Sequence, residues 1–312
     1  MEANKTPQFS IVIPAYNEAE SLPVLFQRIQ IVIKTHDYTA EVIFVNDGST
    51  DGTDEVLEQL ALEQVSDNLQ VHVIHFRRNQ GKAEGLMAGF SAARGKIVIT
   101  MDADLQDDPQ EIPKLLDALE KGNADLISGW KYPRKDPLEK RMFSFVFNRV
   151  TAFFTGVKLH DMNCGFKIYR SEVVKTLHLY GDLHRYIPIL ANAAGFSVAE
   201  VKVKHHPRQF GVSKYGFKRI PKGFFDLITV LFLTKYKKRP MHFFAGLGSL
   251  FTFGGIVVFI GIAVLHFFPT IQFPMTPLWF SGGFCIVLGI ILCATGLLGE
   301  LLVSFFARGD KR

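Results

Sequence analysis

The segment Lys96-Ile-Val-Ile-Thr-Met-Asp-Ala-Asp-Leu-Gln-Asp-Asp-Pro109 joins a mostly apolar run to a dense acidic turn. Residues 97–101 have the length and composition of one buried strand. Because side chains alternate along an extended chain, Asp102 and Asp104 should leave the strand end on the same side. With the amide oxygen of Gln106, these two carboxylates suit a hard divalent cation, which most often serves a phosphate or diphosphate. The alternative is a solvated acidic turn that caps the next helix.

Upstream of this turn, strand-like and helix-like segments alternate. Strands are expected at residues 9–13, 41–45, 69–76 and 96–101, and helices at residues 18–34, 54–64 and 81–93. Repeated strand–helix units predict an α/β fold, with a Rossmann-like, mainly parallel sheet and helices on both faces. Ligands of such sheets bind at the carboxyl ends of the strands.

Polar clusters follow three of these strands, at residues 14–18, 46–53 and 102–108. Each cluster alone could be a tight turn or a helix cap, but three on one edge of a sheet favour a binding site. After the third strand, Arg77, Asn79 and Lys82 could touch a phosphate or a ribose. The spacing there is not that of a P-loop, and no Gly-x-Gly-x-x-Gly pattern indicates a nicotinamide enzyme.

Three motifs carry a resemblance to a known family. Ser10-Ile-Val-Ile-Pro-Ala-Tyr-Asn-Glu18, Val45-Asn-Asp-Gly-Ser-Thr-Asp-Gly-Thr53 and Asp102-Ala-Asp-Leu-Gln106 resemble family 2 glycosyltransferases of the GT-A fold. The third motif is similar to the branch of dolichol-phosphate mannose synthases and polyprenyl-phosphate glucosyltransferases. The resemblance implies that Asp102, Asp104 and Gln106 hold Mg²⁺ or Mn²⁺ on the diphosphate of a nucleotide sugar. It also implies that Pro14, Tyr16, Glu18 and Asp47 hold the base and ribose of the nucleotide. The full set of expected donor contacts adds Asn17, Gly48, Asn79, Lys82, Asp102 and Lys131 to these four.

The middle of the chain should complete the catalytic domain. Another strand is expected at residues 124–130, followed by basic residues that include Lys131, Arg134 and Arg141. These could be a solvated face or could contact phosphate, and the family tends to carry Arg at the position of Lys131. The segment Asp161-Met-Asn-Cys-Gly-Phe-Lys167 matches a loop of the same branch. The expected catalytic residues are Asp104, Asp161, Arg134 and Arg141, whereas Cys164 is expected to be a packed small residue.

The segment after the last expected strand, residues 197–204, has the features of an acceptor site. His205 and His206 should face opposite ways, so a shared metal ion is not expected. The pattern Arg-x-x-Gly-x-Ser-Lys-Tyr resembles the acceptor loop of the branch. Its two cations and hydroxyl, from Arg208, Ser213 and Lys214, suit a lipid phosphate.

Composition places the C-terminal part of the chain at a membrane. The chain has 312 residues and a net charge of +5, with a basic excess at residues 202–239. A basic cluster before apolar segments indicates a membrane surface rather than nucleic acid. Residues 217–236 are expected to form an interfacial helix broken near Pro221, or else a buried helix. Residues 241–268 and 277–306 are each long enough to span a bilayer.

The flanking cations orient these spans. Basic residues precede the first span and follow the second, so the catalytic domain and both termini are expected in the cytosol, at the inner or cell membrane. Three cysteines make no disulfide framework, and no signal peptide is expected at the N-terminus. The expected parts are residues 1–210, 211–240 and 241–312. Glycines repeat every seven residues (Gly254 and Gly261; Gly282, Gly289 and Gly296), and could pack within the hairpin or between subunits of a homo-oligomer.

Taken together, the sequence predicts a membrane-anchored inverting glycosyltransferase. It would move a hexose, expected to be glucose from UDP-glucose, to polyprenyl (undecaprenyl) phosphate on the cytosolic leaflet. One alternative is a GDP-mannose-dependent polyprenyl- or dolichyl-phosphate mannosyltransferase, and another is a catalytically silent membrane scaffold. A processive polysaccharide synthase is not favoured, because neither Trp130 nor Trp279 follows an Arg as its Gln-x-x-Arg-Trp motif requires.

Overall fold

The computed structural model describes residues 6–63, 68–132, 138–210, 219–237, 239–266 and 275–309. The chain forms two compact units, Met1–Val230 and Leu231–Arg312. The first holds all the strands described below, and the second holds the two long apolar helices. The three-part division at residues 210 and 240 stays a prediction.

A seven-stranded sheet forms the centre of the first unit, in the order β3-β2-β1-β4-β6-β5-β7. The strands are β1 (Phe9–Ala15), β2 (Ala40–Asn46), β3 (Leu69–His75), β4 (Ile97–Thr100), β5 (Leu126–Lys131), β6 (Lys167–Arg170) and β7 (Val198–Val203). β1, β2, β3 and β4 are parallel, as are β5 and β7, while β6 pairs antiparallel with both β4 and β5. The predicted, mainly parallel sheet is confirmed, and the short strand β6 is an addition to it.

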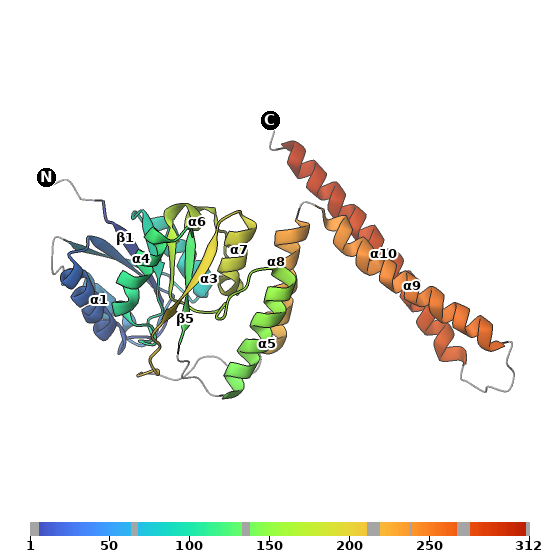
Figure 1. The fold of residues 1–312 in the computed structure, drawn as a ribbon, viewed down its shortest axis with the longest axis horizontal. Coiled ribbons are helices and arrows are strands. Elements are labelled where there is room, and N and C mark those ends of the chain that lie inside the picture. Colours follow the sequence, from blue (N-terminus) through green and yellow to red (C-terminus); the bar gives the residue numbers. More distant parts are fainter. Residues whose placement is uncertain are drawn as a thin grey trace. The chain divides into compact units, whose positions relative to one another are not determined.

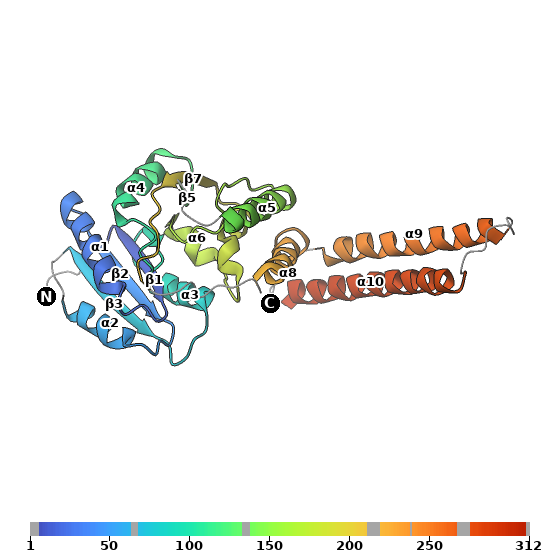
Figure 2. The same cartoon turned by 90° about the horizontal axis from the view of Figure 1, so that it is seen from below.

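Helices cover both faces of this sheet (Figures 1 and 2). The helices before the two long apolar ones are α1 (Leu22–His36), α2 (Thr53–Leu62), α3 (Lys82–Ala92), α4 (Ile112–Lys121), α5 (Leu138–Thr155), α6 (Ser171–Thr176), α7 (Ile187–Ala193) and α8 (Arg219–Leu231), with 3-10 turns η1 (Pro109–Glu111) and η2 (Leu183–Tyr186). Because side chains alternate along β1, Ile11 and Ile13 join the core with α1 and α4, whereas Val12 joins the core with α3. Both faces of the sheet are therefore buried.

The order of the strands fixes where a ligand can bind. β1 lies between β2 and β4, so the chain runs to one side of β1 through β2 and β3 and then returns to its other side at β4. Ligands of open α/β sheets bind at such a switch point, outside the carboxyl ends of the strands. The loops after β1, β2 and β4 carry the three polar clusters that the sequence predicted.

The expected helix break at Pro221 is wrong. The helix α8 runs from Arg219 to Leu231 without interruption, and Pro221 lies in its first turn. A proline is tolerated there because the first N–H groups of a helix have no carbonyl partner within the helix. The departure from α-helical geometry comes later, in a π-helical turn at Phe232–Tyr236.

The second unit is a hairpin of two apolar helices, α9 (Pro240–His266) and α10 (Met275–Gly309). Both are long and apolar enough to cross a membrane, and their most apolar windows are only 17% and 11% buried. A core helix of a soluble protein would be mostly buried, so this exposure favours lipid as the surroundings. The chain is accordingly a membrane protein with a C-terminal hairpin.

Small residues allow the two helices of the hairpin to touch. A Cβ atom on Gly248 would lie 2.6 Å from the Gly289 carbonyl oxygen, and one on Gly255 would lie 2.6 Å from the Gly282 carbonyl oxygen. The expected row at Gly254 and Gly261 does not share this contact, since a Cβ on either would meet nothing within 4 Å. At the other end, the Met241 amide donates to Glu300, 3.2 Å away, so this acidic side chain caps α9.

Candidate active site

The acidic turn after β4 presents two carboxylates to one cavity. The backbone of Leu105 has a left-handed φ of 61°, which turns the chain sharply. Asp104 Oδ1 accepts a hydrogen bond from the Gln106 amide at 3.2 Å, and Asp108 caps η1 through the Gln110 amide at 3.0 Å. Asp102 and Asp104 both line the same cavity, as their alternate positions led us to expect.

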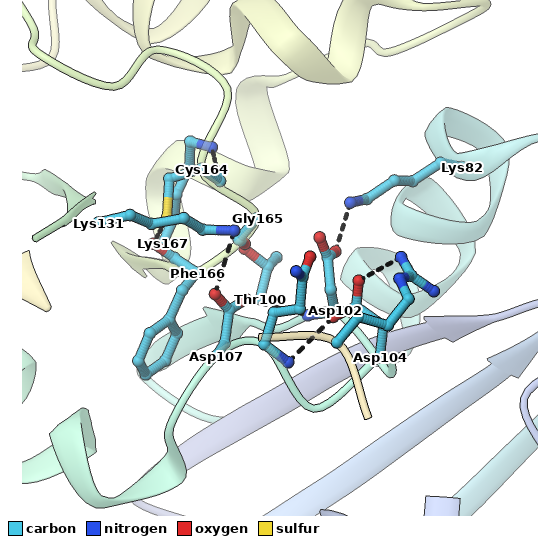
Figure 3. A network of polar contacts seen from close by, with 12 residues as sticks. Lys82, Thr100, Asp102, Asp104, Asp107, Lys131, Cys164, Gly165, Phe166 and Lys167 are labelled. Carbon is cyan, nitrogen blue, oxygen red and sulfur yellow. Dashed lines mark hydrogen bonds and ion pairs between the residues drawn. The ribbon is translucent and has the colours of Figure 1, made fainter. Parts of the chain in front are cut away.

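A basic side chain faces each of these carboxylates. Lys82, the first residue of α3, pairs with Asp102 (Figure 3). Arg208 Nη2 lies 2.6 Å from Asp104 Oδ2. Lys82 and Arg208 come from segments far apart in the sequence, and both line the cavity. The site therefore combines negative and positive charge, as needed to hold both a cation and the phosphates that the cation serves.

The two carboxylates differ in their affinity for protons. Burial would raise the pKa of Asp102, but Lys82 and then Lys131 hold it well below its usual range. Burial, together with the negative charges of Asp102 and Asp107, raises the pKa of Asp104 to about 6. Arg208 opposes that rise without cancelling it. Burial is thus the largest cause of the raised pKa of Asp104, and repulsion from Asp102 and Asp107 is the second.

The cavity has a volume of about 380 Å³. Nine of the residues expected to contact the donor, the metal or the acceptor line it: Pro14, Tyr16, Glu18, Asp47, Asn79, Lys82, Asp102, Asp104 and Arg208. Asp182 and His184 of the segment before α7 also line it, although they were not among the expected site residues. The sequence signal for them was the segment Asp182-Leu-His-Arg-Tyr186, which resembles the family but lies far along the chain from the three motifs.

Side chains tie the loops after β1 and β2 together. The Asn17 amide donates to Ser49 Oγ at 2.9 Å, and Asn17 Oδ1 accepts from the Thr50 amide at 2.8 Å. The Glu18 amide donates to Thr53 Oγ1 at 2.9 Å. Asn17 has a left-handed φ of 54°, which an asparagine tolerates better than most residues. Asn17 therefore shapes the donor side of the cavity through the loop and is not one of the residues that line it.

Asp47 and Gly48 attach the loop after β3 to the loops after β1 and β2. Asp47 accepts hydrogen bonds from the Gln80 amide at 2.6 Å and the Gly81 amide at 2.9 Å. Gly48 has a φ of 66°, and a Cβ atom there would lie 2.5 Å from the backbone carbon of Arg78. Only a glycine fits such a close approach of two backbones. The loops after β1, β2 and β3 thus form one connected wall of the cavity.

We expect Gly48→Ala to weaken donor binding by disturbing this wall. The added methyl group would have to displace backbone in the loop after β3, at a cost of about 1–3 kcal/mol for the strained conformation. Isothermal titration with a nucleoside diphosphate should show the loss of affinity. Gly52→Ala is the matched control, because Gly52 has a φ of 86° but a Cβ there would meet only Glu55, at 3.7 Å. Equal losses in both variants would contradict the proposed role of the close contact.

A buried cluster of charged residues lies behind the acidic turn. Lys131 Nζ lies 3.5 Å from Asp107 Oδ1, and the Asp102 amide donates to Asp107 Oδ2 at 3.4 Å (Figure 3). Burial opposes the charge of Lys131, but Asp107 and other acidic neighbours raise the pKa of its ammonium group above its usual range. Lys131 does not line the cavity, so its clearest contact is with the turn that carries Asp102. Its expected contact with the donor stays a prediction.

The loop before β6 belongs to the same cluster. Asp161 is 2% exposed, and neither of its carboxylate oxygens has a hydrogen-bond partner among the described residues. Burial raises the pKa of the Cys164 thiol to about 12, which fits a packed residue and not a nucleophile. A Cβ atom on Gly165 would lie 2.5 Å from the Asp102 carboxylate, so this loop approaches Asp102 through its backbone. Asp161 interacts electrostatically with Lys131 in this cluster, and its catalytic role stays a prediction.

Several expected site residues cannot be placed at the cavity. Arg134, Ser213 and Lys214 lie outside the described residues, and Arg141 is described only as part of the backbone of α5. Gln106 does not line the cavity, and its backbone carbonyl accepts from the His206 amide at 2.9 Å. Lys167 was noted only as the end of a motif, yet its buried amine donates to the Cys164 carbonyl and lines a smaller cavity of about 20 Å³ behind Asp102.

The carboxylates of the turn fit a hard divalent cation. Their oxygens are the ligands that Mg²⁺ and Mn²⁺ prefer, and Asp102, Asp104 and Asp107 are close enough to repel one another. No group of three or more His, Cys, Asp or Glu side chains that could hold a metal ion occurs in the part of the chain that the structure describes. Asp102 and Asp104 would hold such a cation from the cavity wall, together with diphosphate oxygens and water.

Metal binding should weaken as the pH falls through about 6. A carboxylate must be deprotonated to bind a metal, and the pKa of Asp104 is raised to about 6. Above that pH Asp104 is ionised and affinity should be constant, whereas below it the apparent affinity should fall about tenfold per pH unit. Titration of Mn²⁺ between pH 5 and 8, followed by its electron paramagnetic resonance, measures this. Arg208→Gln should move the onset to higher pH, and an unchanged onset would contradict the assignment to Asp104.

Comparison with known proteins agrees with this site. A family model described as "Glycosyl transferase family 2" matches residues 10–177, which include the turn after β4. Among solved structures, glucosyl-3-phosphoglycerate synthase from Mycobacterium tuberculosis, in complex with Mn²⁺, uridine diphosphate and phosphoglyceric acid, has a TM-score of 0.56. The match covers 73% of this chain and 78% of the solved chain. The sequences are 17% identical, so the likeness concerns the fold alone.

Curated relatives are similar over nearly the whole chain. The dodecaprenyl-phosphate galacturonate synthase of Rhizobium johnstonii is 34% identical over 306 residues, which cover 97% of this chain and 90% of the relative. The undecaprenyl-phosphate 4-deoxy-4-formamido-L-arabinose transferase of Pseudomonas fluorescens is 34% identical over 307 residues, which cover 96% and 85%. The chain therefore belongs to glycosyl transferase family 2, with the GT-A fold, in the branch that includes these polyprenyl-phosphate sugar transferases.

Proposed function

We propose that this glycosyltransferase moves a sugar from a nucleoside diphosphate to a polyprenyl phosphate at the membrane surface. The observation that carries the proposal is the paired arrangement at one cavity, where Asp102 faces Lys82 and Asp104 faces Arg208. The apolar hairpin of α9 and α10 supports a lipid acceptor, as do the names of the relatives. Transfer forms a bond between the acceptor phosphate oxygen and the anomeric carbon, and breaks the bond from that carbon to the diphosphate.

The donor would lie along the wall formed by the loops after β1, β2 and β3. Tyr16, Asp47 and Asn79 line that part of the cavity and are the proposed contacts of the nucleoside. Asp102 and Asp104 would hold Mg²⁺ or Mn²⁺, which neutralises charge on the leaving diphosphate when bound. Lys82 sits where it can exchange its bond to Asp102 for a phosphate oxygen. The side chains themselves would orient the diphosphate so that its bond to the anomeric carbon points away from the incoming acceptor phosphate.

The acceptor needs positioning more than it needs a base. A phosphate monoester has a second pKa of about 6, so its oxygen is largely ionised at neutral pH. Arg208 lines the cavity and is the proposed contact of this phosphate, with Ser213 and Lys214 of the same sequence motif. Bringing two anions together is an electrostatic task that basic side chains perform. Asp161, Arg134 and Arg141 remain proposed participants, and inversion at the anomeric carbon follows from the resemblance to the family.

The orientation in the membrane follows from charge. Lys235, Lys237, Lys238 and Arg239 precede the first apolar helix, and Arg308, Lys311 and Arg312 lie at the end of the second. By the positive-inside rule, we place both ends of the hairpin and the catalytic unit on the cytosolic side of a cell membrane. The acceptor would then be the polyprenyl phosphate of the cytosolic leaflet.

A transfer assay with purified full-length protein in detergent tests the proposal. Undecaprenyl phosphate and Mg²⁺ or Mn²⁺ would be offered with UDP-glucose, the donor expected from the resemblance, and in parallel with UDP-galacturonate and GDP-mannose. We expect metal-dependent transfer from one donor, which also identifies the sugar. Metal-dependent binding of a nucleotide sugar without transfer from any donor would favour a catalytically silent scaffold. Transfer without added or bound metal would contradict the metal assignment.

A further inference from the structure

A group of polar side chains lies at the ends of β2 and β3, outside the cavity. The helix α2 packs against these strands (Figure 2), and it carries Asp54 and Glu58 one turn apart on the same face. Asn46, the last residue of β2, donates through Nδ2 to Asp54. His75, the last residue of β3, has its Nε2 atom 3.0 Å from Glu58 Oε1. None of these four residues lines the cavity, so a role for them must be indirect.

The contacts of Asn46 determine which nitrogen of His75 carries a proton. Asn46 Oδ1 accepts a hydrogen bond from the Ser49 amide at 3.1 Å, so the amide nitrogen Nδ2 is the atom that faces His75. This Nδ2 lies 3.3 Å from His75 Nδ1 and can only donate, so His75 Nδ1 is an acceptor without a proton. The proton of the neutral ring is then on Nε2, and Glu58 accepts its hydrogen bond.

No other arrangement satisfies this group equally well. A proton on His75 Nδ1 would face the N–H of Asn46, and neither group could accept. A flip of the Asn46 amide would leave the Ser49 amide facing another N–H, and would place an oxygen against the Asp54 carboxylate. Asn46 is only 1% exposed, so water cannot replace lost partners. Neutral His75 therefore fixes one orientation of the Asn46 amide.

Asn46 in turn shapes the loop that faces the donor. The bond from the Ser49 amide to Asn46 Oδ1 closes a turn around Asp47 and Gly48. Asp47 lines the cavity, and the Ser49 hydroxyl is bonded to the loop after β1. A change in the ring at position 75 would thus reach the cavity through two side chains, Asn46 and Ser49.

We propose that His75 is a positioning residue for donor binding, which acts through Asn46 as the neutral Nε2–H tautomer. It keeps the turn at Asp47 and Gly48 in the one shape that receives the nucleoside, without touching the ligand. Glu58 holds the ring by its far nitrogen, so α2 takes part in the same arrangement. The inference rests on the proposed function for the identity of the ligand, whereas the effect on the turn does not depend on a ligand.

Hydrogen–deuterium exchange of the full-length chain in detergent tests the arrangement without a ligand. His75→Phe keeps a flat ring but offers no acceptor to Asn46, whereas His75→Asn restores an oxygen near the position of Nδ1. The matched control is His72→Phe on the same strand, because the partners of that ring are Arg94 and Glu41, outside the turn. His75→Val, which suits a strand and also lacks an acceptor, replaces His75→Phe if that variant does not fold.

We expect the Ser49 amide to exchange about tenfold faster in His75→Phe, because Asn46 loses a buried partner and its orientation is no longer fixed. His75→Asn and His72→Phe should exchange at this amide like the parent protein. Fragmentation of the labelled peptides by electron transfer resolves the single amide. Equal acceleration in His72→Phe would overturn the proposal, since a general loss of stability in β3 would then explain the effect.

Donor binding is the second readout. UDP and GDP would be titrated against the parent protein with Mn²⁺, and the variants with whichever binds. We expect about tenfold weaker binding in His75→Phe, recovery in His75→Asn and no change in His72→Phe. In the transfer assay the KM for the donor should rise while kcat stays the same, since His75 affects binding and not the reacting atoms.

Two results would overturn the proposed role. If the exchange of Ser49 in His75→Phe equals that of the parent, His75 does not orient Asn46. If exchange accelerates but the affinity for the donor stays the same, the residue supports the fold and not the donor. Failure of both diphosphates to bind the parent would count against the proposed function, and the exchange of Ser49 would still decide whether His75 controls the turn.

Discussion

Asp104→Asn is expected to reduce sugar transfer by about 10²- to 10³-fold, the range for losing one preorganised electrostatic group at a reaction centre. The substitution keeps the shape of the side chain and its acceptor oxygen for the Gln106 amide, but removes the negative charge. Arg208 would then lose its carboxylate partner, and a divalent cation would lose one of its two proposed ligands. Initial rates with the donor identified in the transfer assay, at saturating metal, would measure the effect.

The control for this variant is Asp117→Asn on α4. Asp117 is a half-exposed carboxylate that pairs with Lys121 on the same helix, away from the cavity. It should leave transfer unchanged, since exposed ion pairs within one helix contribute little. Melting temperatures of both variants should stay near that of the parent protein. Full activity in Asp104→Asn would show that the metal and the diphosphate are held elsewhere.

Gly289→Val should strongly destabilise the apolar hairpin. The first added carbon would lie 2.2 Å from Thr252 Oγ1 and 2.5 Å from the Gly248 carbonyl oxygen, so α9 and α10 would have to separate. Overpacking of this kind costs about 1–3 kcal/mol, and more where a backbone must move. Unfolding of the purified protein in mixed detergent micelles, with increasing sodium dodecyl sulfate, would measure the loss.

Gly254→Val and Gly261→Val are matched controls for the hairpin. Both are glycines within α9 on positions where a Cβ atom meets nothing within 4 Å. They share the change in composition and helix propensity but not the clash, so their stability should remain close to that of the parent. Equal destabilisation at positions 254 and 289 would mean that propensity, and not the close contact of the helices, explains the effect.

The parts of the fold with simple local signals could be predicted from the sequence. β1, β2 and β4 are short runs of buried Ile and Val, and each is followed by polar residues at the same edge of the sheet. β6 has only four residues, two of them basic, and its antiparallel pairing depends on β4 and β5. No local pattern could show that this strand exists or that its loop reaches Asp102.

The site was predictable where spacing alone decides the geometry. Asp102 and Asp104 are alternate residues after a strand, so they share a cavity. Lys131 is the last residue of β5, at the same edge of the sheet, yet the structure pairs it with Asp107 behind the turn. Which carboxylate receives a lysine depends on tertiary packing that the sequence does not display. For the same reason, the apolar residues of α5 could not be assigned to a core or to an exposed face.

The hydrogen bonds between the loops after β1, β2 and β3 have a consequence for how donor selectivity can change. They run from backbone amides to Asn17, Ser49, Thr53 and Asp47, so these loops are already ordered before a ligand arrives. A nucleotide that binds there loses little affinity to ordering the protein. The rest of the lining, with Asp182, His184 and Arg208, is built from other segments. If the nucleotide binds as proposed, substitutions in those segments would leave the loops that hold it unchanged.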